Sequence, residues 1–288
     1  MSKTPRAFVA GWPAAHSRSP LIHNYWLREH GLPGSYVARA VPPPDFPRFL
    51  AGLTDEGFVG GNVTLPLKER AFALAAERTT TAQAIGAANT LWFEAGRLIA
   101  DNTDAEGFLG ALDTEAPGWE RAPGPAVVLG AGGAARAIVA ALLSRDREVV
   151  IVNRTRERAD FLARRFKGAG AADWGAAPSL LSRASLLVNT TSLGMHGQPP
   201  LDIDLSPLPP EAVVDDIVYY PLETRLIRDA RARGFRAVPG LGMLLHQAAP
   251  AFARFFGVRP KVSAQLRRLI EADMEKMVSE KASSEKTA

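Results

Sequence analysis

The chain has 288 residues, enough for one large domain or two ordinary ones, each with its own core. Its hydrophobic content of 47% and charged content of 22% exclude a disordered or fibrous protein. The absence of cysteine excludes disulfides, thiolate catalysis and cysteine-ligated metals. The net charge of +4 is spread along the chain, with its densest basic stretch at 154–165, and an anionic small molecule accounts for it as well as a polyanion does. We expect no nucleic-acid partner.

The N-terminal segment has one apolar run, residues 7–10, which is too short for the core of a signal peptide. Elsewhere, no apolar run approaches the roughly 18 residues needed to cross a bilayer. We therefore expect a soluble, cytoplasmic protein that does not bind membranes.

In the first half of the chain, short apolar runs alternate with helical patterns. Strands are predicted over 6–10, 35–41 and 57–63, and the first is followed by a helix over 20–30. Strands spaced by helices indicate βαβ units and a mainly parallel sheet. The Pro- and Gly-rich segment 116–125 is typical of a connection between domains.

A second α/β series begins at Ala126. The run 126–129 is continuously apolar, as expected of a strand buried on both faces, and a Gly-rich turn and a helix over 134–144 follow it. Further strands are predicted over 148–152, 185–189 and 212–218. From Leu244 the pattern is helical to about Met274, and the polar tail 275–288 is predicted to be disordered.

The Gly-rich turn has dinucleotide-binding spacing. In residues 130–135, Gly130 allows a tight turn, Gly132 allows backbone to approach a pyrophosphate, and Ala135 permits close helix packing. A packing turn alone is the other interpretation, but the strand before it and the helix after it favour cofactor binding.

The end of the next predicted strand indicates which dinucleotide binds. Sites for NAD usually have a carboxylate there for the ribose 2′-hydroxyl, whereas this chain has Asn153, Arg154 and Thr155, with Arg156 and Arg158 just beyond. A guanidinium can bind a 2′-phosphate through paired hydrogen bonds, which favours NADP. The alternative is a solvated basic helix start.

Three polar segments in the first half are open to two interpretations each. Ser17 and Ser19 precede a helix and could cradle a carboxylate or simply begin that helix. Lys68 falls in the first turn of a helix, where an isolated lysine is usually a surface residue. Thr103 and Glu106 have capping-box spacing, so segment 101–104 could be only a helix start.

Taken together, these segments resemble the shikimate dehydrogenase family. The similarity runs from about residue 8 to 258. Its motifs are GWPAAHSRSPLIHN (11–24), GGNVTLPLKE (60–69), GAANT (86–90), DNTDAEGF (101–108), GAGGAARA (130–137), VNRT (152–155), NTTSLGM (189–195), DIVYYPLET (216–224) and GLGMLLHQAAPAF (240–252). Two departures are Ala105, where glycine is usual, and Thr80, where an acidic residue is usual.

The resemblance implies two α/β domains, the second a Rossmann-type doubly wound parallel sheet that binds NADP, with the active site in the cleft between them. The substrate domain would be 1–112, completed by C-terminal helices over 244–274, and the NADP domain 113–243. The implied catalytic pair is Lys68 and Asp104, which also touch the reacting hydroxyl. The other implied substrate contacts are Ser17, Ser19 and Tyr219 for the carboxylate and Thr64, Asn89 and Gln247 for the ring hydroxyls. The implied cofactor contacts are Gly130, Ala131, Gly132, Gly133, Ala134, Asn153, Arg154, Thr155, Arg158, Thr190, Ile217, Gly240 and Met243.

The implied reaction is the reversible, NADPH-dependent reduction of 3-dehydroshikimate to shikimate in chorismate and aromatic amino acid biosynthesis. Negative charge would develop on the ketone oxygen, where Lys68 could stabilise it and donate a proton while Asp104 orients the ammonium. No cluster of histidines or carboxylates has metal-ligand spacing, so we expect no metal site. His16, His23 and His246 are expected to pack or cap.

Two alternatives stay open. One is a quinate/shikimate dehydrogenase that uses NAD and NADP, against which Asn153 and Arg154 argue. The other is a non-catalytic, NADP-binding regulatory relative, which would be expected to lose Lys68 or Asp104. The sequence leaves the oligomeric state open, a homodimer included.

Overall fold

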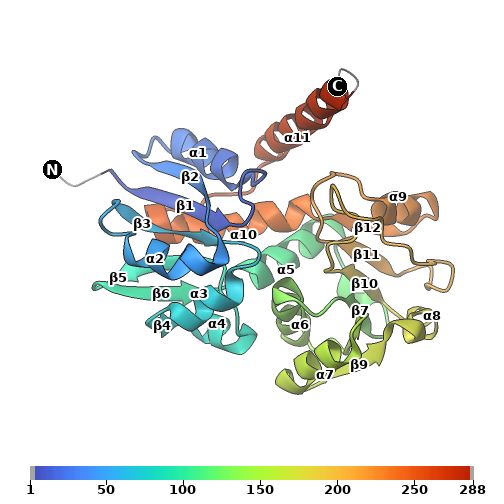
Figure 1. Ribbon diagram of the computed structural model, residues 1–288. Helices are drawn as coiled ribbons and strands as arrows, with labels where there is room; N and C mark the ends of the chain where they lie inside the picture. The colour runs from blue at the N-terminus through green and yellow to red at the C-terminus, as the bar shows by residue number, and fades with distance from the viewer. Residues whose placement is uncertain (1–3, 286–288) are drawn as a thin grey trace. The chain divides into compact units, whose positions relative to one another are not determined.

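The computed structural model describes the backbone of residues 4–285 and the side chains as far as residue 277. It contains two compact units, each with a six-stranded sheet and flanking helices (Figure 1). Unit 1 comprises the chain up to Gly107 together with 245–262, and unit 2 comprises 108–244 and the chain from Ser263. The division falls after Gly107, inside helix α5 (Asp104–Glu115), and the predicted boundary at residue 112 lies in the same helix.

The sheet of unit 1 has the strand order β2-β1-β3-β5-β6-β4. Its strands are β1 (Arg6–Gly11), β2 (Ser35–Ala40), β3 (Phe58–Val63), β4 (Glu77–Arg78), β5 (Thr90–Glu94) and β6 (Arg97–Asp101). The three strands predicted from the sequence are present, and β1 pairs in parallel with both β2 and β3.

This sheet is mainly parallel, as predicted, and β5 is the one antiparallel strand among the residues described. Strand β5 runs antiparallel to β3 and to β6, with which it forms a hairpin. At the turn of the hairpin, Ala95 has φ of 49° and Gly96 has φ of 77°. Positive φ at both central residues suits the right-handed twist of a tight hairpin.

The helices of unit 1 follow the strands along the chain. They are α1 (Ser19–Glu29), α2 (Phe46–Ala51), α3 (Lys68–Leu74) and α4 (Thr80–Ile85), with a 3-10 turn at Pro43–Asp45. Phe8, Phe46 and Phe58 belong to the main core of the unit and are almost fully buried. His23 of α1 is fully buried and stacks on Tyr36 with 4.0 Å between ring centroids. Burial lowers the pKa of His23 to about 3, so this histidine packs as a neutral ring.

Unit 2 contains an entirely parallel sheet with the order β12-β11-β10-β7-β8-β9, the arrangement of a doubly wound dinucleotide-binding fold. Its strands are β7 (Ala126–Leu129), β8 (Val149–Asn153), β9 (Ala169–Asp173), β10 (Leu186–Asn189), β11 (Val213–Asp216) and β12 (Arg236–Pro239). The predicted strands are therefore confirmed to within two residues at each end. The continuously apolar run of β7 is fully buried, as its composition predicted.

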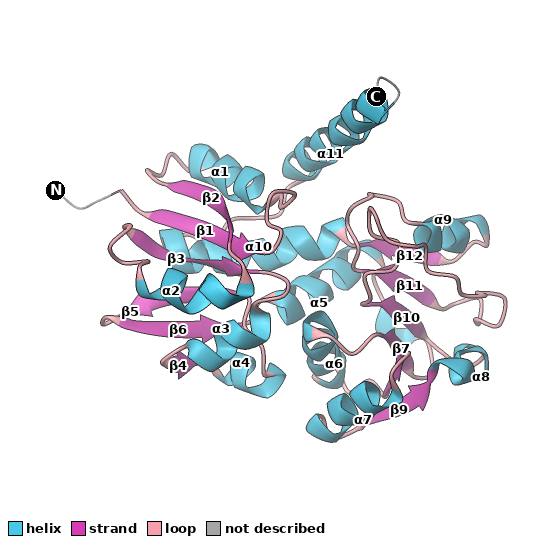
Figure 2. Ribbon diagram, viewed as in Figure 1, coloured by secondary structure: helices cyan, strands magenta, loops and turns pink. Residues whose placement is uncertain are grey.

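Helices flank both sides of this sheet in Figure 2. They are α6 (Gly133–Leu143), α7 (Arg156–Arg165), α8 (Ala177–Leu181) and α9 (Arg225–Ala232), with 3-10 turns at Trp119–Arg121 and Trp174–Ala176. One core cluster joins Leu181 of α8 and Leu226 of α9 to alternate residues of the strands, among them Val127 and Val214.

Segment 116–125 packs within unit 2, which corrects its prediction as a connection between domains. Trp119 is 2% exposed, and its indole Nε1 donates to Asp113 Oδ1 at 2.9 Å. Arg147 donates to the carbonyl oxygens of Ala122 and Gly124 at 3.0 and 2.7 Å. The glycine and proline residues thus shape a packed turn and not a free linker.

Of the last two helices, only the second departs from the prediction that both complete the first domain. Helix α10 (Leu241–Phe256) ends in unit 1, whereas α11 (Ala264–Glu285) groups with unit 2, where Arg267 forms an ion pair with Glu115. Helix α11 continues beyond Met274, so the predicted disordered tail is helical as far as Glu285, and 286–288 lie outside the described residues. Glutamate and lysine recur in this part of the chain and have high helix propensity.

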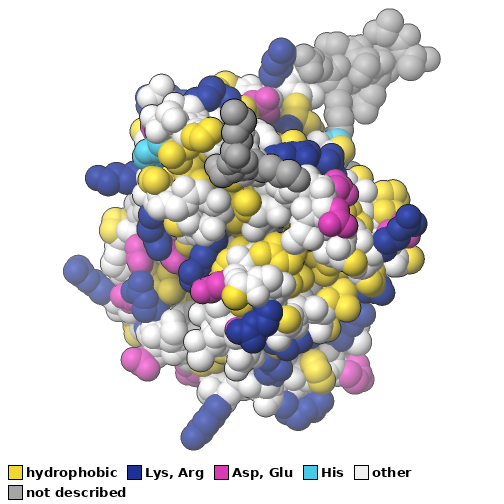
Figure 3. All heavy atoms as spheres, turned by 90° about the vertical axis from the view of Figure 1, so that its left-hand side faces the viewer, with side chains coloured by type: hydrophobic (Ala, Val, Ile, Leu, Met, Phe, Trp, Pro, Cys, Tyr) yellow, Lys and Arg dark blue, Asp and Glu magenta, His cyan; other side chains and the backbone are white. Residues whose placement is uncertain are grey.

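Within the residues described, no helix combines the length and the apolar character needed to cross a membrane. Figure 3 shows one face of the molecule, where lysine and arginine side chains are scattered among acidic, apolar and neutral ones. The face drawn therefore lacks the continuous basic stripe with which proteins track a nucleic-acid backbone.

Candidate active site and cofactor site

Lys68 is positioned where strand β3 passes into helix α3. The amide of Thr64, the first residue after β3, donates to the carbonyl of Ala10 at 2.8 Å, which fixes the start of the connection on β1. Lys68 is the first residue of α3, and its carbonyl accepts from the amide of Ala88 at 2.9 Å. Backbone hydrogen bonds therefore fix both the start of the β3–α3 connection and Lys68 itself.

Asp104 begins helix α5 and lies at the other side of the same site. Its amide donates to Asn102 Oδ1 at 3.0 Å, and Asn102 Nδ2 donates to the carbonyl of Ala87 at 2.9 Å. The helix start was predicted correctly, but the capping-box pairing is not formed. Thr103 instead exchanges hydrogen bonds with Asn89, and Glu106 forms an ion pair with Arg259.

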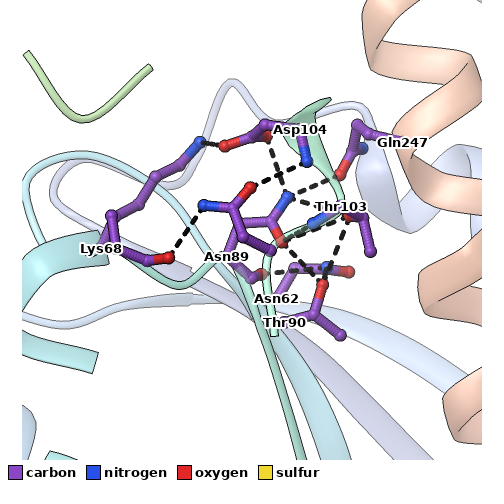
Figure 4. A network of polar contacts seen from close by, with 9 residues as sticks. Asn62, Lys68, Asn89, Thr90, Thr103, Asp104 and Gln247 are labelled. Carbon is purple, nitrogen blue, oxygen red and sulfur yellow. Dashed lines mark hydrogen bonds and ion pairs between the residues drawn. The ribbon is translucent and has the colours of Figure 1, made fainter. Parts of the chain in front are cut away.

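Lys68 and Asp104 form a buried ion pair (Figure 4). The Lys68 ammonium contacts Asp104 Oδ2, and the two side chains are only 14% and 5% exposed. The other carboxylate oxygen, Oδ1, accepts from Asn89 Nδ2 at 2.9 Å. Both oxygens of Asp104 are thus engaged, and the ammonium has a fixed position.

The side-chain amide of Asn89 has one orientation, which its neighbours determine. Its Oδ1 accepts from the Thr103 amide and the Thr90 hydroxyl, each at 2.8 Å, so its Nδ2 faces the acceptors. These acceptors are Asp104 Oδ1, Thr103 Oγ1 at 3.0 Å and Gln247 Oε1 of α10 at 3.3 Å. The predicted residues Lys68, Asn89, Asp104 and Gln247 therefore form one contiguous network in unit 1.

Further residues support this network, and sequence reasoning did not single them out. Asn62 Nδ2 donates to the Asn89 carbonyl at 3.1 Å and to Thr90 Oγ1 at 3.0 Å, while its Oδ1 accepts from the Tyr36 hydroxyl at 2.7 Å. Burial raises the pKa of Tyr36 well above its ordinary value, with hydrogen bonds to Asn62 and Ser19 opposing the shift, so the phenol stays protonated. The sequence offered one signal for Asn62 and Thr90, which lie in the same motifs as Thr64 and Asn89.

The two predicted serines also lie in unit 1. Ser19 is the first residue of α1 and is 5% exposed, and its amide donates to Ser17 Oγ at 3.3 Å. Tyr219, the third residue predicted to hold the carboxylate, lies in unit 2, half-buried just after β11. Seven of the eight predicted substrate contacts thus belong to unit 1.

The Gly-rich turn of unit 2 has the backbone that a phosphate site requires. Gly130 has φ of +108°, and a Cβ atom there would lie 2.6 Å from Thr190 Oγ1, so another residue would be strained and would clash. Gly132 caps α6 with no side-chain hydrogen bond, is exposed, and has open space where a Cβ would stand. The amides at the start of α6 are therefore available to an anion.

The residues predicted to bind the 2′-phosphate lie at the end of β8. Asn153 ends this strand, and its Nδ2 donates to the carbonyl of Thr155 at 2.8 Å. Arg156 forms ion pairs with Asp160 and Asp173 at 2.9 and 3.1 Å. Arg154 and Arg158 are exposed and have no carboxylate partner in the described part of the chain. Two guanidinium groups beside the α7 N-terminus are thus available for an anionic ligand.

Three family models match the chain. Residues 9–91 match the shikimate dehydrogenase substrate binding domain, 122–194 match shikimate / quinate 5-dehydrogenase, and 240–268 match the shikimate 5'-dehydrogenase C-terminal domain. A shikimate dehydrogenase (NADP(+)) of Methylocella silvestris is 66% identical over 94% of this chain and 98% of its own length. The chain belongs to the shikimate dehydrogenase family. The resemblance predicted from the sequence motifs is thereby confirmed.

Solved structures of similar dehydrogenases share the fold. The shikimate 5-dehydrogenase of Thermus thermophilus, in complex with NADP(H) and shikimate, superposes with a TM-score of 0.81 at 41% identity, over 89% of this chain and 95% of that one. A quinate dehydrogenase of Corynebacterium glutamicum in complex with NAD superposes with a TM-score of 0.84 at 28% identity, over 93% and 99%. The predicted fold class is confirmed, and the fold alone does not distinguish the two cofactors.

The two departures from the family pattern leave the network intact. Ala105 follows Asp104 within helix α5, where an alanine favours the helical backbone. Thr80 begins α4 directly after Thr79, whose hydroxyl accepts from the Ala82 amide at 3.1 Å. Neither residue takes part in a hydrogen bond of the Lys68–Asp104 network.

Proposed function

We propose that this chain catalyses the reversible, NADP-dependent interconversion of shikimate and 3-dehydroshikimate. The observation that carries the proposal is the buried Lys68–Asp104 ion pair, oriented by Asn89, in a chain of this family. The names of the relatives supply the substrate and the cofactor, and the pair supplies a cation that could act as a proton donor. The reaction would serve chorismate and aromatic amino acid biosynthesis.

The residues of unit 1 would act on the substrate oxygen that changes charge. When bound, NADPH supplies the hydride. Lys68 would stabilise the developing alkoxide and donate its proton from Nζ, and Asp104 would orient the ammonium. In the reverse direction Lys68 has to accept a proton. Thr64, Asn89 and Gln247 would bind the ring hydroxyls, and Ser17, Ser19 and Tyr219 would bind the carboxylate.

The residues of unit 2 fit NADP. The exposed Gly132 and the uncapped start of α6 suit a diphosphate, because backbone amides there have no side-chain acceptor. Arg154 and Arg158 suit the 2′-phosphate, since each is exposed and has no competing carboxylate within the described residues. The remaining contacts would come from Gly130, Ala131, Gly133, Ala134, Asn153, Thr155, Thr190, Ile217, Gly240 and Met243.

One spectrophotometric panel tests this function against both alternatives. The purified chain is given shikimate or quinate with NADP or NAD, and the near-ultraviolet absorbance of the reduced cofactor is followed. We expect turnover with shikimate and NADP above all other combinations. Comparable rates with quinate or NAD would favour the dual-cofactor enzyme. NADP binding without turnover of either substrate would indicate a regulatory relative.

We further propose a cytoplasmic location and a homodimer. Light scattering after size-exclusion chromatography tests the homodimer, and a mass of one chain at micromolar concentration would refute it. Fractionation of the source cells tests the location.

A further inference from the structure

Strand β11 of unit 2 ends in a buried carboxylate that the proposed mechanism does not use. Asp216 is fully buried, and three donors converge on its two oxygens. Oδ1 accepts from Asn189 Nδ2 at 2.9 Å and from the Val218 amide at 3.1 Å, and Oδ2 accepts from the Thr224 hydroxyl at 2.6 Å. Among the described residues, Asp216 has no cation as a partner.

Asn189 stands opposite Asp216 in the sheet register and ends the neighbouring strand β10. Its Oδ1 accepts from the amide and the hydroxyl of Thr191, at 3.0 and 2.7 Å. Its Nδ2, besides binding Asp216, donates to the carbonyl of Leu193 at 3.2 Å. One buried amide therefore holds both ends of the turn that follows β10.

The two connections held in this way carry predicted ligand contacts. Thr190 lies in the connection held by Asn189, and its hydroxyl also donates to the Leu129 carbonyl at 2.7 Å, beside Gly130. Val218, whose amide donates to Asp216, stands between Ile217 and Tyr219, which are both predicted ligand contacts. Both connections leave the carboxyl ends of parallel strands, which is the edge where doubly wound sheets bind their ligands.

Burying a carboxylate at this position costs free energy, which packing alone does not require. Burial raises the pKa of Asp216 to about 6, which shows that the protein opposes the charge. The carboxylate nonetheless accepts from three donors in three different segments, and an apolar residue would remove the acceptor of all three hydrogen bonds. A purely structural role would be to support Thr224, whose hydroxyl caps α9 by accepting from the Ile227 amide at 3.3 Å.

We propose that Asp216 and Asn189 are a positioning pair that holds segments 190–193 and 217–219 in the conformation that binds NADP. The proposal rests on the function proposed above, because the cofactor contacts in these segments come from the family resemblance. Asp216 acts through the backbone it holds and does not itself touch the ligand.

The test measures the dissociation constant of NADP by titration calorimetry, without turnover. Asp216→Ala should weaken NADP binding roughly tenfold or more, because both connections lose an anchor. Asp216→Asn should restore most of the affinity, since an amide oxygen can still accept from Asn189 and Val218. Leu181→Ala is the matched control, because it removes a fully buried side chain of α8 and lowers stability without touching the pair.

The proposal is overturned if Asp216→Ala binds NADP as well as Leu181→Ala does at an equal loss of thermal stability. It is equally overturned if Asp216→Asn binds as poorly as Asp216→Ala. Should Asp216→Ala not fold, Asn189→Ser is measured in its place and has to show the same loss of affinity. Wild-type protein that binds NADP but does not oxidise shikimate would refute the proposed function and leave the positioning pair standing.

Discussion

Replacing Lys68 by methionine removes the cation of the buried pair while nearly keeping the volume of the side chain. Asp104, 5% exposed, would then have a single strong donor, Asn89 Nδ2 at 2.9 Å. Breaking a buried ion pair by removing one partner costs about 3–5 kcal/mol. Because Asn89 remains, we expect a loss of about 3 kcal/mol in the free energy of unfolding.

The kinetic effect should be separate and larger. Lys68 is the proposed proton donor to the reacting oxygen, so removing it should lower kcat on the order of 10²–10⁴-fold. Asp104→Asn should also lower kcat, because the ammonium loses its orienting carboxylate. The double variant should lose less than the sum of the two single free-energy losses, since the residues act as a unit.

The assay is kcat for shikimate oxidation at saturating substrate and NADP, with unfolding measured in parallel. Arg70→Met serves as control, because Arg70 is an exposed residue of the same helix and should leave both quantities unchanged. Equal kcat in wild type and Lys68→Met would refute the proton-transfer role. Full additivity in the double variant would show that Lys68 and Asp104 act independently.

Three further predictions concern unit 2. Arg154→Ala should lower the ratio of kcat/KM for NADP to that for NAD by roughly tenfold to a hundredfold, whereas Arg156→Ala, already paired with two aspartates, should barely change it. Gly132→Ala should leave the melting temperature unchanged and weaken the binding of NADP roughly tenfold. Gly175→Ala is the control and should change neither quantity. Unchanged NADP affinity in Gly132→Ala would show that the turn serves packing alone. The Asp216 pKa is raised from 3.8 to about 6, so its contribution to stability is present below pH 3.8 and lost as pH rises through 6. Between pH 3.8 and 6, the free energy of unfolding of the wild type should fall by about 3 kcal/mol relative to that of Asp216→Asn. If the two proteins show the same dependence of unfolding free energy on pH, the burial of a charge at Asp216 is contradicted.

The parts of the fold that local composition determines could be predicted from the sequence. The run 126–129 is apolar on both faces and is followed by glycines at 130 and 132, so both the buried strand and the turn at the helix start were recognisable. The β5–β6 hairpin was not predicted, because only Ala95 and Gly96 mark its turn and its flanking residues lie between recognised motifs. Ala95 takes a positive φ that alanine rarely adopts, so the sequence marks this turn only weakly.

The family resemblance implied the Lys68–Asp104 pair, but the hydrogen-bond network around it was not predicted. Sequence motifs indicated Asn89 and Gln247, but their contact joins residues 158 positions apart and follows only from the tertiary fold. Thr103 shows the limit of local reasoning, since its spacing to Glu106 predicted a capping box while its hydroxyl bonds to Asn89. Competition between local and long-range partners is settled by packing, which spacing does not encode.

The most direct test of the central claim is the reduction of 3-dehydroshikimate by NADPH with the purified chain, the product being identified by mass and chromatographic retention. The account predicts stoichiometric formation of shikimate, with kcat/KM in the enzymatic range of roughly 10⁴–10⁸ M⁻¹s⁻¹. NADPH that binds but is not consumed, in a chain that retains both Lys68 and Asp104, would contradict it.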